Sequence, residues 1–345
     1  MTPERGIPPL NVVRDETNHF LGRHTALSLL KQRPNLWRRI PYLRENNGRA
    51  PPVVLAVGDR RRVYAIASRL LNAVLLPEVA WKLTNPRSRS KHLPSTAFGR
   101  VAMAIGIASS IPVLIVETQM GSPATQIILN EVLSNQLTSN EYTIGREKIN
   151  LPHKIIIRIG TAGGINCESL PPIRVGDVVS ATHSVGATGA IIQTLSRLDF
   201  WNPEVYQSFR SQWARLGTDF TITHDGHPRV ECSRDVVEAI DAAGARLMKN
   251  AFLRGGNVTK DSLYAELSND IFLDLCRTEN CRTTEMELSA IAVAAREHQA
   301  SFGMVSAIVG VLPGSSFAQN QKMRTVAEER AVRIGLEALT FLNQH

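Results

Sequence analysis

The sequence predicts an α/β protein in which a mostly parallel β-sheet is covered by helices, and three similar segments support this prediction. Each segment is a short apolar run followed by a glycine turn: 53–57 before Gly58, 113–116 before Gly121, and 155–159 before Gly160. Helical spacing follows the first two, at residues 63–71 and 124–137. Runs that are apolar throughout are typical of strands buried on both faces, as in parallel sheets.

The rest of the chain continues this alternation. We expect two more strands and three more helices: strands at 178–181 and 302–309, and helices at 235–249, 286–298 and 324–341. Residues 1–50 are rich in Arg, Asn and Pro with weak periodicity, which indicates an N-terminal extension with one helix that ends before Pro51-Pro52. Residues 51–345 then form one domain. Two polar stretches, near 138–152 and 196–228, interrupt it as insertions.

Composition narrows the function classes. The 345 residues are 43% hydrophobic, and the net charge is +8 with a pI near 9.6. The basic residues are dispersed and lack interleaved aromatics, which favours small anionic substrates over nucleic acid. The first 18 residues lack the apolar core of a signal peptide, and no run approaches the length of a membrane span. We therefore expect a cytoplasmic protein whose four cysteines are reduced, with no metal site.

Two arginines point to an anion site. A strand that ends in a glycine turn directs backbone N–H groups at a ligand above the sheet, and such turns bind phosphate. Arg158 interrupts an apolar strand, where a charge is costly unless it meets a partner or an anion. Arg62 follows Gly58 in the first turn of the next helix. With Gly58 and Thr161, the two arginines would hold a tetrahedral dianion; a buried salt bridge and a solvated helix start are the alternatives.

A second cluster opens the helix expected at 286–298. Glu285 and Glu287 lie at its N-terminus, where the helix dipole favours carboxylates. One of them is also suited to accept the two hydroxyls of a ribose, and helical spacing directs the two carboxylates to different places.

These motifs together resemble one known family. The segments that carry the resemblance are 57–62, Glu117 to Pro123, Arg158 to Gly163, 175–179, 259–264 and 285–287, in the same order and spacing from about residue 53 to the C-terminus. They are similar to the uridine phosphorylase branch of the nucleoside phosphorylase family. The resemblance implies a central mixed sheet, partly closed as a barrel and flanked by helices, with the active site completed across a dimer.

The resemblance also implies a role for each candidate residue. Phosphate would be held by Gly58, Arg62, Arg158 and Thr161, with Arg62, Arg158 and Glu287 as the catalytic set. Ribose would be held by Met286 and Glu287, and by His19 from a neighbouring subunit. The base would lie beside Gly163, Leu263 and Glu285. Phosphate is then a co-substrate, and no cofactor is expected.

The resemblance does not extend to the residues that bind the polar edge of uracil. The glutamine and arginine that read uracil in the family are absent from residues 263–269, so Arg254, Lys260 or Gln193 are the possible substitute donors. The phosphate-site arginine of the neighbouring subunit also lacks a clear counterpart; Arg87 or Arg89 are candidates. Ala124 replaces the serine of an interface cation site that some relatives carry, so the ligands of such a cation are not identifiable.

The expected reaction is the reversible phosphorolysis of uridine to uracil and ribose 1-phosphate, in pyrimidine salvage. Purine-specific relatives and nucleosidases use a late aspartate to protonate the purine, whereas residues 309–314 contain no carboxylate. Three alternatives remain: a purine nucleoside phosphorylase, a nucleosidase of the same fold, and a catalytically weak regulatory subunit. The expected partners are a nucleoside and phosphate, with neither nucleic acid nor membrane. The two insertions favour a homodimer over a hexameric ring.

Overall fold

The computed structural model describes the chain from residue 38 to residue 343 with gaps. The described residues are 38, 40–76, 101–134, 141–145, 147–151, 153–166, 170–186, 188–196, 205–248, 252–261, 270–312 and 321–343. The strands are β1 Val53–Val57, β2 Leu71–Leu75, β3 Met103–Ala108, β4 Ile111–Glu117, β5 Glu141–Ile144, β6 Glu147–Asn150, β7 Lys154–Ile165, β8 Val178–Val185, β9 Phe220–Ile222, β10 Pro228–Glu231, β11 Phe252–Thr259, β12 Cys281–Glu285 and β13 Ala300–Leu312. The helices are α4 Pro41–Glu45, α5 Arg60–Ala67, α7 Ser122–Leu133, α8 Gly189–Ser196, α9 Val205–Arg215, α10 Arg234–Met248, α11 Asp270–Thr278, α12 Leu288–Glu297 and α13 Gln321–Leu342.

A single mixed sheet organises the domain, and five of its strands close into a barrel. The pairing runs β7–β12–β11–β8, and β13 joins β8 back to β7. Strands β1, β4, β3 and β2 extend the sheet from β7, and β10 and β9 extend it from β8. The α/β class and the partly closed barrel are thus confirmed. The sheet is less parallel than the apolar runs predict, because β13 is antiparallel to β8 and β12 is antiparallel to β7.

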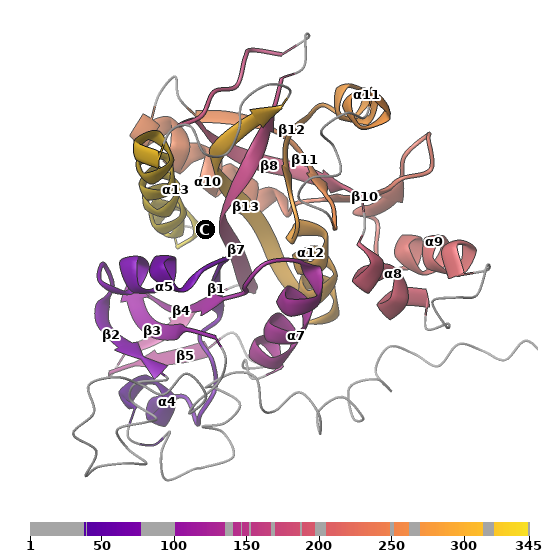
Figure 1. The fold of residues 1–345 in the computed structure, drawn as a ribbon. Coiled ribbons are helices and arrows are strands. Elements are labelled where there is room, and N and C mark those ends of the chain that lie inside the picture. Colours follow the sequence, from indigo (N-terminus) through magenta and orange to yellow (C-terminus); the bar gives the residue numbers. More distant parts are fainter. Residues whose placement is uncertain are drawn as a thin grey trace, which may run out of the picture.

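Helices cover both faces of the sheet (Figure 1). Strand β1 illustrates this arrangement, because its residues alternate between two apolar clusters. Val54 and Ala56 face α7 and α12. Val53, Leu55 and Val57 face α5 and α13. Helices α10 and α13 lie side by side on the second face, and α7 and α12 pack together on the first. Both faces of β1 are fully buried, as its uninterrupted apolar sequence requires.

The third glycine segment differs from the prediction. Residues 160–164 do not form a turn; they continue strand β7 and pair with β13 along its length. The three glycines of this segment allow close packing inside the barrel, because a methyl group at Gly164 would lie 3.0 Å from Cγ2 of Ile308. The helix predicted at 63–71 also ends earlier than predicted. Helix α5 stops at Ala67, and Leu71 begins β2 because that segment pairs with β3.

The other predicted elements are confirmed with small changes of boundary. Helix α12 starts two residues later than expected, after the turn that holds Glu287. The first polar stretch contains the β5–β6 hairpin, and the second contains α9 and β9. Trp213 of α9 is fully buried against Phe209 and Phe220, and all three belong to the same apolar cluster as α7 and α12, so the second stretch extends the core of the first face. In the described part of the chain, no helix is long and apolar enough to cross a membrane.

Candidate active site

Two arginines from separate elements converge beside Gly58. Arg62 lies in the first turn of α5, and Arg158 lies in the middle of β7 next to Ala56 of β1. A methyl group at Gly58 would lie 3.5 Å from both Nη atoms of Arg158 and 3.7 Å from Nη2 of Arg62. Any side chain at this position would therefore fill the space between the two guanidinium groups, which glycine leaves open.

Asp59 fixes the orientation of Arg62. Its Oδ1 accepts the backbone N–H of Arg62 at 3.0 Å, which caps the start of α5. Its Oδ2 accepts Nε and Nη2 of Arg62, each at 2.7 Å, while Nη1 donates to the carbonyl of Ile159 at 3.2 Å. One carboxylate therefore starts the helix and also holds the arginine. Asp59 is not among the site residues predicted from the sequence, although an aspartate directly before a helix is a capping signal.

Arg158 forms a buried ion pair with Glu287. Nη2 of Arg158 lies 2.6 Å from Oε2 of Glu287, and the two side chains are only 4% and 6% exposed. Nη1 donates to Oγ1 of Thr118 at 3.3 Å, and Nε has no hydrogen-bond partner in the described part of the chain. The buried-salt-bridge alternative is therefore real, but the guanidinium keeps donor capacity beyond its ion pair.

The turn after β4 joins this cluster to the start of α12. The backbone N–H of Gly121 donates to Oε1 of Glu287 at 2.8 Å, and the hydroxyl of Ser122 donates to the carbonyl of Met286 at 2.8 Å. Gly121 has φ of +88°, a conformation that L side chains rarely adopt. The second predicted glycine turn is thus part of the site, and Met286 lies partly exposed beside Glu287.

The charges of the cluster constrain one another. Burial alone would raise the pKa of Glu287, but the charge of Arg158 and the N–H of Gly121 hold that pKa below its ordinary value. Burial and the like charge of Arg158 lower the pKa of the Arg62 guanidinium, and Asp59 opposes them. At neutral pH the site therefore presents an ionised carboxylate beside two facing guanidinium groups. An anion between the guanidiniums would relieve their mutual repulsion.

The remaining predicted residues lie at different depths. Thr161 follows Gly160 in β7 and is partly exposed, and Gly163 pairs with Thr284 where β7 meets β12. Glu285 is 6% exposed, and both of its carboxylate oxygens accept hydrogen bonds from its own chain. His19 and Leu263 lie outside the described residues, as do Arg87 and Arg89. Their roles, like the phosphate role of Thr161 and the base-binding roles of Gly163 and Glu285, stay predictions.

The candidate donors for the base are separated. Lys260 follows β11, and its backbone N–H donates to the carbonyl of Glu285 at 3.0 Å, which brings it next to the cluster. Burial lowers the pKa of Lys260 to about 8, although Cys276 and Glu285 oppose this change. Arg254 is 60% exposed and lies 3.4 Å from Asp241 of α10. Gln193 belongs to α8. Of Lys260 and Arg254, Lys260 is therefore the better placed.

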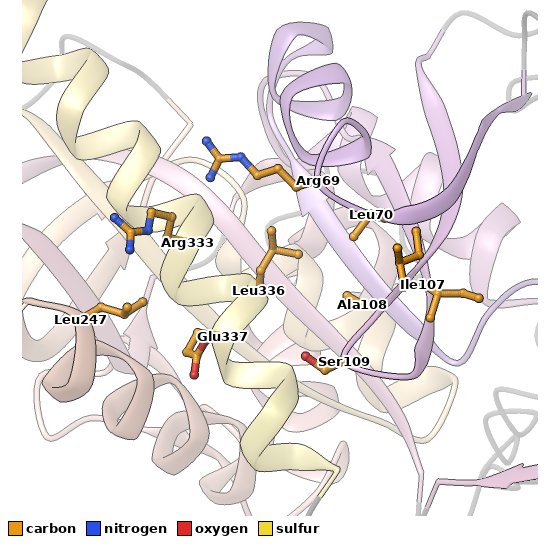
Figure 2. Close-up of a pocket in the computed structure, with 10 residues that line it drawn as sticks. Arg69, Leu70, Ile107, Ala108, Ser109, Leu247, Arg333, Leu336 and Glu337 are labelled. Atoms are coloured by element: carbon orange, nitrogen blue, oxygen red, sulfur yellow. The ribbon is translucent and has the colours of Figure 1, made fainter.

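A surface hollow of about 340 Å³ lies elsewhere on the domain (Figure 2). It is lined by residues between α5 and β2, by the end of β3, and by α10 and α13, among them Arg69, Leu70 and Arg333. Arg62 and Gly58 stand at the opposite end of α5, and none of the residues of the cluster contributes to the hollow. The hollow is thus separate from the candidate active site.

Comparison with known proteins decides the family. The sequence profile described as the phosphorylase superfamily matches residues 75–340. The chain belongs to the phosphorylase superfamily. The family resemblance and the enzyme class predicted from the sequence, a pentosyltransferase of the nucleoside phosphorylase kind, are confirmed by this match. No curated protein sequence matches the chain.

Solved structures of the phosphorylase superfamily share the fold at low identity. Uridine phosphorylase from Vibrio fischeri ES114, complexed with 6-hydroxy-1-naphthoic acid, has a TM-score of 0.56 at 16% identity; the match covers 86% of this chain and 93% of that one. Purine nucleoside phosphorylase from Toxoplasma gondii, in complex with immucillin-H, has a TM-score of 0.55 at 18% identity, with 88% and 96% covered. The 5′-methylthioadenosine/S-adenosylhomocysteine nucleosidase from Neisseria meningitidis has a TM-score of 0.53 at 14% identity, with 84% and 98% covered. These similarities support the fold. The substrate is inferred from the residues of the site.

Proposed function

We propose that the protein is a uridine phosphorylase, which converts uridine and phosphate reversibly to uracil and ribose 1-phosphate. The observation that carries this proposal is the convergence of Arg62 and Arg158 beside Gly58, next to the carboxylate of Glu287. The two guanidinium groups suit a phosphate dianion through paired N–H donors. The N-terminus of α5 adds the positive end of its dipole.

The proposed chemistry follows from the charges. Breaking the bond between C1′ and the base builds positive charge on the ribose, as in glycoside cleavage. Phosphate bound between the arginines stabilises that charge and then attacks C1′, so no covalent enzyme intermediate forms. Glu287 accepts the ribose hydroxyls and holds the sugar in line with the phosphate. The role of Met286 is to pack against the sugar from its partly exposed position beside Glu287.

The choice of uracil rests on the end of β13. A purine leaves most readily when a carboxylic acid protonates its ring, and this acid lies late in the chain in purine-specific relatives. In this chain residues 309–312 are Val, Gly, Val and Leu, all within the buried strand β13. Uracil can leave as an anion when N–H donors face its carbonyl oxygens, and we propose that Lys260 supplies one of them. The facing arginines argue against a nucleosidase, which uses water in place of phosphate.

The same proposal includes a homodimer that works in the cytoplasm in pyrimidine salvage. Met120, directly before Gly121, is 70% exposed, and Ile127 of α7 is 39% exposed. An exposed apolar side chain next to Gly121 and a second one on the following helix suit an interface with a second copy. Uridine cleavage that stays constant as the protein is diluted from dimer to monomer would contradict a site shared between subunits.

A panel of nucleosides tests the substrate. We expect uracil release from uridine only when phosphate is present, and no base release from inosine or adenosine under the same conditions. Thymidine and cytidine complete the panel, and release is measured by chromatography of the free base. Release of hypoxanthine or adenine would indicate a purine enzyme, release without phosphate would indicate a nucleosidase, and silence throughout would indicate a regulatory subunit.

A further inference from the structure

A buried polar network surrounds Glu285 at the end of β12. Its Oε1 accepts hydrogen bonds from Nδ2 of Asn257 and from Oγ1 of Thr259, each at 2.9 Å. Its Oε2 accepts the backbone N–H of Glu287 at 2.8 Å, and the N–H of Leu288 lies 3.0 Å from both oxygens. The carboxylate therefore binds two strand side chains on one side and the first N–H groups of α12 on the other.

In this arrangement Glu285 and Glu287 have different roles at the start of α12. A helix begins with N–H groups that lack partners within the helix, and the residue at the N-cap usually supplies an acceptor. Glu287 occupies the N-cap of α12 but makes no capping hydrogen bond with its side chain. Glu285 supplies the acceptor in its place. The carboxylate of Glu287 is consequently left to pair with Arg158 and with the N–H of Gly121.

The strand side of the network is itself held by further hydroxyl groups. Oγ of Ser184 in β8 lies 2.8 Å from Oγ1 of Thr259, and Asn257 donates to the same Oγ at 3.2 Å. Thr283 of β12 donates to the side-chain oxygen of Asn257 at 3.0 Å. All of these residues are buried. A fully satisfied buried network holds its members rigidly, so Glu285 has a fixed place relative to three strands.

We infer that Glu285 is a positioning residue: it binds the first N–H groups of α12 and thereby sets where Glu287 meets the ribose. This inference rests on the proposed function of Glu287. It replaces direct contact with the base as the role of Glu285, because its two oxygens already accept from four donors of its own chain, which fills the capacity of a carboxylate, whereas those of Glu287 accept from two.

The charge of Glu285 makes its hydrogen bonds to the N-terminus of α12 sensitive to pH. Burial, and then the negative charge of Glu287, raise the pKa of Glu285 to about 7, while Arg158 and the N–H of Leu288 oppose the rise. The charge of Glu285 also acts on Lys260 after β11 and on Cys232 after β10. Protonation places a hydrogen on an oxygen that already faces N–H and O–H donors. The hydrogen bonds between Glu285 and the N-terminus of α12 therefore weaken as the pH falls through about 7. Affinity for the nucleoside falls as a result.

Kinetics of Glu285→Gln test the inference. At saturating phosphate, the KM for uridine should rise about tenfold, the effect of losing a hydrogen bond to a charged acceptor, with a smaller change in kcat. Wild type should show a rise in KM below pH 7, and the variant should not. Thr259→Val should reproduce part of the effect and Thr259→Ser should not, because serine keeps the hydroxyl. Unchanged KM and pH profile in an active enzyme would overturn the inference.

Hydrogen exchange gives a readout that does not depend on activity. Amide protection of residues 287 and 288 should fall about tenfold in Glu285→Gln, since their shared acceptor is weakened. Glu279→Gln is the matched control, because it neutralises another largely buried carboxylate, one that pairs with Arg229 and has no contact with α12 among the hydrogen bonds of the described residues. Equal protection in wild type and Glu285→Gln would overturn the inference. Lack of activity on uridine in wild type, with the expected exchange, would instead refute the proposed substrate alone.

Discussion

Replacing Arg158 with methionine should abolish phosphorolysis and destabilise the fold at the same time. The substitution removes guanidinium donors from the anion site, and losing one such donor typically lowers kcat by about 10²–10³. It also leaves Glu287 buried without its 2.6 Å partner, which should lower the free energy of unfolding by about 3–5 kcal/mol. Steady-state kinetics and urea unfolding measure the two effects.

Two further variants separate these effects. Arg158→Lys keeps a positive charge for Glu287 but loses the planar fork, so stability should largely return while phosphate binding stays weak. Arg229→Met removes an arginine that also lies 2.6 Å from a glutamate, Glu279, at a 29% exposed position away from the cluster. Its kcat/KM should equal that of wild type. An Arg158→Met variant that retained normal turnover would show that the phosphate site has been misplaced.

Replacing Glu287 with glutamine should separate sugar binding from phosphate binding. The amide keeps the shape of the side chain and an acceptor for Gly121, but it loses the charge that pairs with Arg158. We expect kcat/KM for uridine to fall by about 10²–10³, since a preorganised charged contact to the sugar is lost. Phosphate should bind more tightly, because the carboxylate that competes with it for the guanidinium of Arg158 has been neutralised.

Calorimetric titration with inorganic phosphate measures the second effect. Glu279→Gln is the control, since it neutralises a carboxylate in a comparable ion pair with Arg229 without touching the cluster. Parallel loss of phosphate affinity and turnover in Glu287→Gln would mean that Glu287 builds the phosphate site instead of the sugar site.

The sequence predicts the sheet-forming segments well because apolar runs bounded by glycine are local signals. It fails at Gly160, where five residues that look like a turn continue strand β7. Glycine is equally compatible with a turn and with tight strand packing. Only the partner strand β13, well over 100 residues away, decides between them. The same limit explains the mixed sheet, because the direction of β13 against β8 depends on closure of the barrel.

The site shows a similar division between local and long-range information. Arg158 is conspicuous in the sequence because it interrupts an apolar strand, and the structure brings it together with Arg62, Gly58 and Glu287. Glu285 and Glu287 look equivalent in the sequence, two residues apart at one helix start. Their different tasks arise from Asn257 of β11, which binds Glu285, and from Arg158 of β7, which binds Glu287.

Transfer of labelled phosphate tests most directly whether Arg62 and Arg158 hold the phosphate that attacks C1′. Uridine is incubated with the protein and radiolabelled inorganic phosphate, and the labelled sugar phosphate and free uracil are counted together. We expect one labelled ribose 1-phosphate for each uracil released, and loss of both products together in Arg158→Met. Uracil release with unlabelled ribose would contradict this expectation, because water would then be the nucleophile and the arginines would not hold the attacking group.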